Sequence, residues 1–167
     1  APGYPADGLR TVTETRPDGS SQISVFGTDA RTNEGQLLST EIRETSVVLR
    51  RTENAYVQNG DIATLPFPTW VGEPLFYEFH RGRGDYTRPL RATTIYQQGE
   101  SFSSLVEQFD VLARPVQTQK FSSLGHSRRD VTTYFDHTGK WILGQVAQTW
   151  NDDEDQILSR TEFDATT

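Results

Sequence analysis

Residues that could perform catalysis are scattered along this sequence instead of forming a known motif. The histidines, His80, His126 and His137, lack the paired spacing of a zinc site. The chain has no cysteine and no Gly-x-Ser-x-Gly pattern, so a thiol nucleophile is impossible and a serine nucleophile is unsupported. Only a glycosidase stays open, because the fold and not the spacing places its two carboxylates. We predict that the protein is not an enzyme and has no catalytic residue, cofactor or metal site.

The densest group of oxygen ligands is the acidic run from Asn151 to Asp155. Calcium accepts such hard donors, but the run lacks the alternating ligands and the central glycine of an EF-hand loop. We expect a solvated acidic turn, and the sequence leaves open whether that turn binds calcium.

Composition restricts the partners of this chain. Its 23 acidic and 16 basic residues give a formal charge of −7, which repels phosphate backbones and disfavours nucleic-acid binding. No apolar run approaches the roughly 18 residues of a membrane-spanning helix, so we predict no membrane insertion. The chain opens on Ala-Pro-Gly-Tyr-Pro without methionine or a visible signal peptide, so we expect a processed or excised chain.

Alternating apolar and polar residues indicate an all-β protein built from short strands. Pro17, Asp18 and Gly19 form a tight-turn signal between the first two alternating runs, which predicts a hairpin there. We expect an antiparallel hairpin meander that curls into a spiral sheet or closes, in one domain over residues 1–167 with a core of its own. The predicted strands are 9–14, 22–26, 36–43, 47–57, 87–97, 101–109, 115–121, 130–135, 141–149 and 156–163.

Residues 61–86 interrupt the strand pattern. Pro66 and Pro68 cannot donate to a sheet ladder, and aromatic residues cluster around them. This aromatic- and proline-rich excursion is expected to cap an open end of the sheet or to present a binding surface. The candidate binding surface combines two of its aromatics with two from the strands: Trp70, Tyr77, Trp141 and Trp150.

A repeated unit lies above the level of single strands. An aromatic ends a strand, aspartate follows, a turn contains Gly or Ala, and Arg or Lys opens the next strand. Asp can accept backbone N–H bonds across the turn while the ring packs on the sheet. Since one unit cannot bury its own face, neighbouring units must complete the core. The residues that define the unit are Phe109, Asp110, Arg114, Phe135, Asp136 and Gly139, and Phe163 with Asp164 opens a further copy, so we expect a longer parent chain.

These residues, with degenerate copies at Phe26, Tyr56 and Tyr96, resemble the YD-repeat (Rhs) family of bacterial polymorphic-toxin and wall-associated proteins. The resemblance implies a piece of a larger, secreted or cell-surface β-shell. Its partners would be adjacent repeats and a C-terminal toxin or effector cargo. The Asp-Pro-containing self-cleavage motif of such shells is missing, and no catalytic residue is carried over. The alternative is an extracellular carbohydrate- or protein-binding module that uses the exposed aromatics. The sequence does not identify the parent protein, the cargo, any ligand or the oligomeric state.

Overall fold

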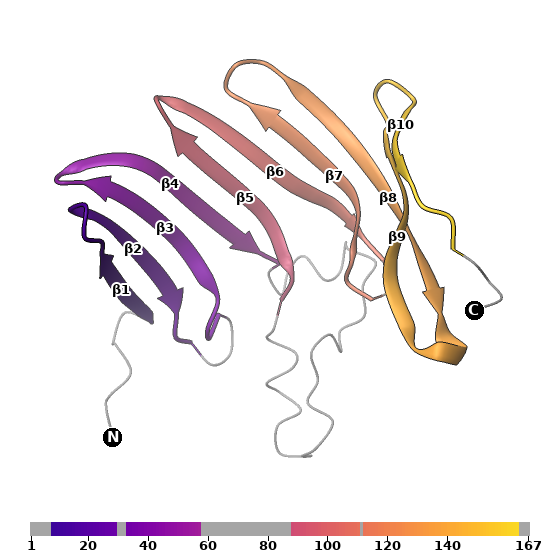
Figure 1. Ribbon diagram of the computed structural model, residues 1–167, viewed down its shortest axis with the longest axis horizontal. Coiled ribbons are helices and arrows are strands. Elements are labelled where there is room, and N and C mark those ends of the chain that lie inside the picture. Colours follow the sequence, from indigo (N-terminus) through magenta and orange to yellow (C-terminus); the bar gives the residue numbers. More distant parts are fainter. Residues whose placement is uncertain (1–7, 30–32, 58–87, 111, 164–167) are drawn as a thin grey trace, which may run out of the picture.

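The computed structural model describes residues 8–29, 33–57, 88–110 and 112–163, which form one antiparallel sheet of ten strands (Figure 1). Each strand pairs with its neighbours in sequence, so the sheet is a simple meander. This confirms the predicted all-β class and every predicted strand. The strands are β1 (Leu9–Thr15), β2 (Ser20–Gly27), β3 (Leu37–Glu44), β4 (Val47–Tyr56), β5 (Leu90–Gln97), β6 (Glu100–Phe109), β7 (Pro115–Ser122), β8 (Ser127–His137), β9 (Ile142–Asn151) and β10 (Gln156–Arg160).

One edge of the sheet, here called the hairpin edge, holds the short turns that lead into the even-numbered strands. The predicted turn at residues 16–19 is confirmed, because the Gly19 N–H donates to the Arg16 carbonyl at 3.0 Å and Gly19 has a φ of 83°. Gln98 and Gly99 both have positive φ, as a two-residue hairpin turn of type I′ requires. The other turns at this edge lie at residues 45–46, 123–126 and 152–155.

The opposite edge, here called the aromatic edge, is where β2, β4, β6 and β8 end (Figure 1). An aromatic residue lies at or close to each of these ends, and the pairing register with the next strand shifts beside it. Such bulges bend a strand and increase its twist. The aromatics in this row are Phe26, Tyr56, Phe109 and Phe135. Tyr96 lies next to the last residue of β5, at the hairpin edge, so this degenerate copy of the repeat does not belong to the row.

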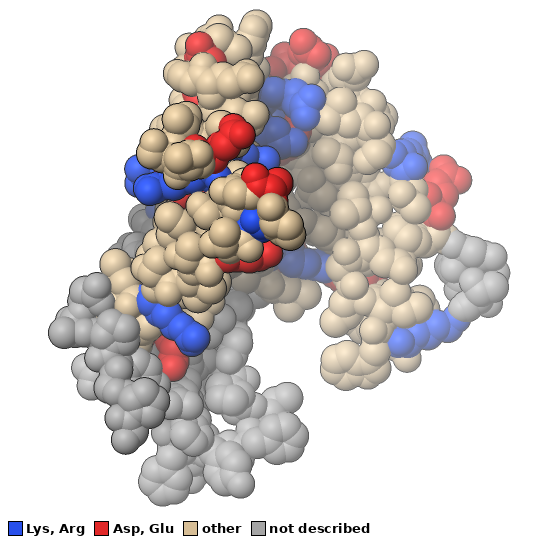
Figure 2. All heavy atoms as spheres, turned by 60° about the vertical axis from the view of Figure 1, so that its left-hand side comes forward, with Lys and Arg blue, Asp and Glu red and all other residues tan. Residues whose placement is uncertain are grey.

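The sheet curls without closing. Strands β1 and β10 each pair on one side only among the described residues. In the space-filling view the described part of the chain arches over a hollow (Figure 2). Acidic and basic side chains are interleaved on the face shown there, so neither sign of charge dominates it.

The core is far smaller than the chain length led us to expect. Among the described residues, only three hydrophobic side chains are buried: Val57, Val106 and Phe109. The physical reason is the architecture, since a single-layered sheet buries its faces only when a second layer covers them. Strands β1 and β10 are exposed along their entire length.

Most strand boundaries differ from the prediction by one to three residues, and the largest differences lie in β5, β8 and β10. Strand β5 begins at Leu90 and not at Thr87. Strand β8 begins at Ser127 and not at Asp130, because Ser127, Arg128 and Arg129 already pair with β7. Strand β10 ends at Arg160 after a register shift between Ile157 and Ser159, so Phe163 lies beyond the strand. No helix within the described ranges has the length and apolar character needed to cross a membrane.

Candidate functional site

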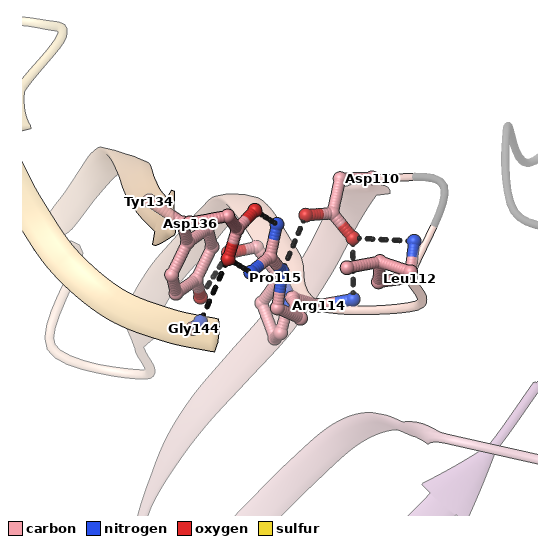
Figure 3. A network of polar contacts seen from close by, with 7 residues as sticks. All are labelled: Asp110, Leu112, Arg114, Pro115, Tyr134, Asp136 and Gly144. Atoms are coloured by element: carbon pink, nitrogen blue, oxygen red, sulfur yellow. Dashed lines mark hydrogen bonds and ion pairs between the residues drawn. The ribbon is translucent and has the colours of Figure 1, made fainter. Parts of the chain in front are cut away.

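The residues of the predicted repeat meet at one junction on the aromatic edge, between the β6–β7 connection and the β8–β9 hairpin (Figure 3). Phe109 ends β6, Asp110 and Arg114 flank the connection, and Asp136 lies near the end of β8. This unit junction therefore contains four of the eight residues selected from the sequence. It also joins one copy of the repeat to the next.

Asp110 stabilises the turn that follows β6, as the sequence predicted. Its Oδ1 accepts the backbone N–H groups of Leu112 and Arg114, both at 2.9 Å. The Ala113 N–H donates to the Asp110 carbonyl at 3.0 Å, and Ala113 has a left-handed φ of 60°. A small side chain limits the strain of that conformation, which explains why Gly or Ala recurs at this place in the unit.

Arg114 links the two copies of the repeat. Its Nε donates to Asp110 Oδ2 at 2.6 Å, and its two terminal nitrogens donate to the two carboxylate oxygens of Asp136 at 2.7 and 2.9 Å. The second contact is a bidentate pair, the strongest geometry available to arginine and a carboxylate. These hydrogen bonds raise the pKa of Arg114 still further above its usual range, so the side chain stays charged.

Asp136 receives a third bond from β9, the other strand of the hairpin. Gly144 has a φ of 76° and donates its backbone N–H to Asp136 Oδ1 at 2.8 Å. The hydrogen bonds from Arg114 and then from Gly144 lower the pKa of Asp136 to about 2. Asp136 is therefore ionised at neutral pH, and it holds β9 as well as Arg114.

Aromatic rings complete the junction. The Arg114 guanidinium lies 4.4 Å from the centre of the Tyr134 ring, and the Tyr134 hydroxyl donates to the Pro115 carbonyl at 2.8 Å. A cation at this distance from a ring face is attracted by the π system. Phe109 is almost completely buried and forms the core cluster with Val57 and Val106.

The second copy of the repeat departs from the first. Gly139 lies in a 3₁₀ helix, Thr138–Lys140, where the His137 Nδ1 accepts the Lys140 N–H at 3.2 Å. Lys140 thus precedes the strand by two residues and does not take the role of Arg114. Phe135 stacks on Phe163 with ring centres 4.8 Å apart, so the aromatic of the third copy does join the row. Asp164 lies outside the described residues.

Two contributors to this edge were missed by the repeat pattern. Tyr134 and Gly144 lie outside the aromatic-aspartate motif, and only the folded hairpin brings Tyr134 to Arg114 and Gly144 to Asp136. The sequence contains a further sign of the repeat. The dipeptide Arg88-Pro89 lies just before β5, and the same dipeptide, Arg114-Pro115, lies at the start of β7. The Val57 N–H donates to the Pro89 carbonyl at 3.0 Å, much as the Asp110 N–H donates to the Arg114 carbonyl at 2.9 Å. Strands β4 and β5 therefore meet at this edge much as β6 and β7 do. The predicted excursion at residues 61–86 lies outside the described residues.

The acidic turn at residues 152–155 is tied to the neighbouring strand. Asp153 accepts the Arg129 N–H at 2.8 Å, and Asn151 donates a side-chain N–H to Glu154 at 3.0 Å. No group of three or more metal-binding side chains assembles in the described ranges. These contacts give the turn a structural role, and calcium binding stays untested.

The candidate aromatic surface is not assembled from the residues that can be placed. Trp141 precedes β9 at the aromatic edge, while Trp150 lies near its other end, a separation of about 30 Å along an extended strand. Trp70 and Tyr77 lie outside the described residues. Trp141 is still unusual, because it is 85% exposed and has a left-handed φ of 53°.

The chemistry of the unit junction is that of a structural link. Arg114 bonds the carboxylates of both Asp110 and Asp136, so it holds the two copies of the repeat together. No family model matches the chain, and no curated protein and no solved structure matches it either. The resemblance to YD-repeat proteins therefore stays a prediction from the sequence.

Proposed function

We propose that this chain is a non-catalytic structural segment of a secreted YD-repeat (Rhs) shell that encloses or scaffolds a toxin or effector domain. The observation that carries the proposal is the open, nearly coreless sheet, in which Arg114 links one unit directly to the next. An open sheet of this kind is suited to form part of the wall of such a shell. Adjacent repeats of the parent protein would extend it, and the enclosed domain would face it.

The free edges support this reading. A strand with an unpaired row of N–H and C=O groups is a template for another strand, and globular proteins normally protect such edges. Strands β1 and β10 are exposed and carry apolar side chains, including Val12 and Ile157. In a repeat protein the neighbouring unit supplies that protection.

Sedimentation velocity over a range of protein concentrations tests the proposal. The isolated chain should associate as its concentration rises, because the free edges pair between copies. Val12→Lys combined with Ile157→Lys places charge on both edge strands and should suppress association. Val48→Lys combined with Val146→Lys adds the same charge at exposed positions of the interior strands β4 and β9, and should leave association intact. A monomer at every concentration would contradict the proposal.

A binding module is the second candidate, and the exposed, left-handed Trp141 favours it. Aromatic residues held in strained backbone conformations occur at ligand sites, where the surrounding structure stabilises them. Titration of the chain with cell-wall oligosaccharides should quench tryptophan fluorescence if Trp141 contacts sugar rings. Trp141→Tyr should reduce the signal more than Trp150→Tyr. Unchanged fluorescence at millimolar sugar would remove the glycan reading.

A further inference from the structure

An open groove of about 470 Å³ crosses strands β5, β6 and β7 toward the hairpin edge. Its walls include the apolar side chains of Phe102 and Leu124, which are 44% and 55% exposed. Large apolar groups left open on a surface commonly mark a contact site. The groove is separate from the unit junction and shares no residue with it.

The strand register explains how the groove is built. Ile95, Phe102 and Ser122 are successive cross-strand partners and form one row on this face. Ser104, Lys120 and Arg128 form the next row in the same way. Directly paired residues share a face of the sheet, and rows two residues apart are adjacent. The groove therefore has an apolar side next to a cationic one.

The cationic row carries excess positive charge. Lys120 Nζ and Arg128 Nε lie 2.7 and 2.8 Å from the two oxygens of Asp130, which is buried. One carboxylate cannot neutralise two cations, and both cations stay about half exposed with further N–H donors. Among the described residues that line this groove there is no carboxylate. In a chain of formal charge −7 this is a local basic site.

A second groove on the other face has the opposite character. Glu41, Glu53 and Glu100 line it together with a single cation, Arg51. The positive groove is therefore a local property of one face and not of the chain as a whole. Charge complementarity selects an acidic partner for that face.

We propose that the groove at Phe102 and Lys120 is a docking site for a polypeptide segment that presents a large apolar side chain beside Asp or Glu. The apolar side chain would cover Phe102 and Leu124, and the carboxylate would bond the free donors of Lys120 or Arg128. A polypeptide suits the site better than a small molecule, because an open groove cannot surround a small ligand as a binding pocket does. The inference goes beyond the proposed shell, since the partner need not be enclosed.

Two blocked peptides probe the site: Glu-Asp-Leu-Phe-Asp-Glu and a counterpart in which lysine replaces every acidic residue. Amide chemical shifts of the labelled chain should move in β5, β6 and β7 with the acidic peptide. Added salt should weaken this binding, because it screens the exposed charges. The basic peptide should leave these shifts unchanged. Equal responses to the two peptides, or none to either at millimolar concentration, would overturn the docking site.

Negative or positive charge placed at Leu124 tests whether the groove selects an acidic partner. Leu124 is exposed in a turn, so substitutions there should leave the fold intact. Leu124→Glu should weaken binding of the acidic peptide about fivefold or more, whereas Leu124→Lys should preserve or strengthen it. Leu112→Glu is the matched control at the aromatic edge and should have no effect. If Leu124→Glu binds as well as the unaltered chain, the proposal is wrong, and the shell proposal is unaffected because it rests on strand association.

Discussion

The chain reverses its direction at both edges of the sheet, but different contacts stabilise the reversals at the two edges. At the hairpin edge, the turns themselves form from local backbone chemistry, as in the pair of positive-φ residues Gln98 and Gly99, and a few longer bonds such as that from Arg129 to Asp153 join neighbouring turns. At the aromatic edge, long-range contacts do the work: Arg114 reaches Asp136, twenty-two residues away, and Phe109 packs on Val57. The turns of the hairpin edge are therefore of a kind found in many hairpins, whereas the aromatic edge holds the residues that define the repeat.

The largest difference between the edges should appear when an aromatic side chain is removed. Phe109 is 1% exposed at the aromatic end of β6, and Phe102 lies near the other end of the same strand. Phe109→Ala should lower the free energy of unfolding by about 3–5 kcal/mol, the cost of emptying a buried aromatic site. Phe102→Ala should cost about 1 kcal/mol or less, because the side chain is already largely in water. Urea denaturation measures both, and equal losses would contradict the difference between the edges.

Removal of Arg114 should have the next largest effect. Arg114→Met keeps much of the side-chain volume but leaves Asp110 and Asp136 without their cation, which should cost about 2 kcal/mol. Arg114→Lys should recover only part of this loss, because lysine cannot make the bidentate contact.

The matched control for Arg114 is Arg160→Met. Arg160 is exposed and lies 3.7 Å from Glu162, so its loss should change stability by less than about 0.5 kcal/mol. Denaturant midpoints of the three variants provide the comparison. If Arg160→Met loses as much stability as Arg114→Met, the link between units contributes no more than an exposed surface ion pair.

A smaller effect is expected from pH. The folded pKa of Asp136 is lowered to about 2, below the value of about 3.9 in unfolded chains, so its ionised form stabilises the fold. That stabilisation is fully present above about pH 5 and is lost as the pH falls toward 2. In Asp136→Asn this part of the acid destabilisation should disappear from melting curves recorded between pH 5 and 2.

Asp18 at the hairpin edge provides the comparison for Asp136. Its pKa is also lowered, because the Ser20 side chain and backbone donate to it. Asp18→Asn should flatten the same pH profile less than Asp136→Asn does, since Asp18 forms local bonds and no link to another unit. A profile that is flattened more by Asp18→Asn would reverse the ranking of the two edges.

The sequence was sufficient to predict the strands and one complete copy of the repeat. Period-two alternation specifies which residues share a face, and turn residues such as Asp18 and Gly19 act locally, so both are legible in a single sequence. The Asp110 turn followed for the same reason. The Arg114–Asp136 pair could not be predicted in this way, because it depends on how two units are placed side by side. Gly144 was missed for a related reason, since its positive φ matters only where β9 passes Asp136.

The size of the core also could not be predicted from the sequence. An alternating strand looks the same whether its apolar face is covered by a second layer or left open. Composition therefore permitted a packed domain where the described strands form a single layer.

The central claim is that neighbouring units supply the stability that this sheet lacks. It is tested most directly by grafting a copy of residues 111–163 after Asp164, which continues the repeat in register, and measuring unfolding in urea. The free energy of unfolding and its dependence on urea should both increase, since each added unit covers a free edge. A grafted sequence of the same composition in scrambled order is the control and should give no gain. If the true copy gives no more stability than the scrambled one, the chain is self-sufficient and the repeat account is wrong.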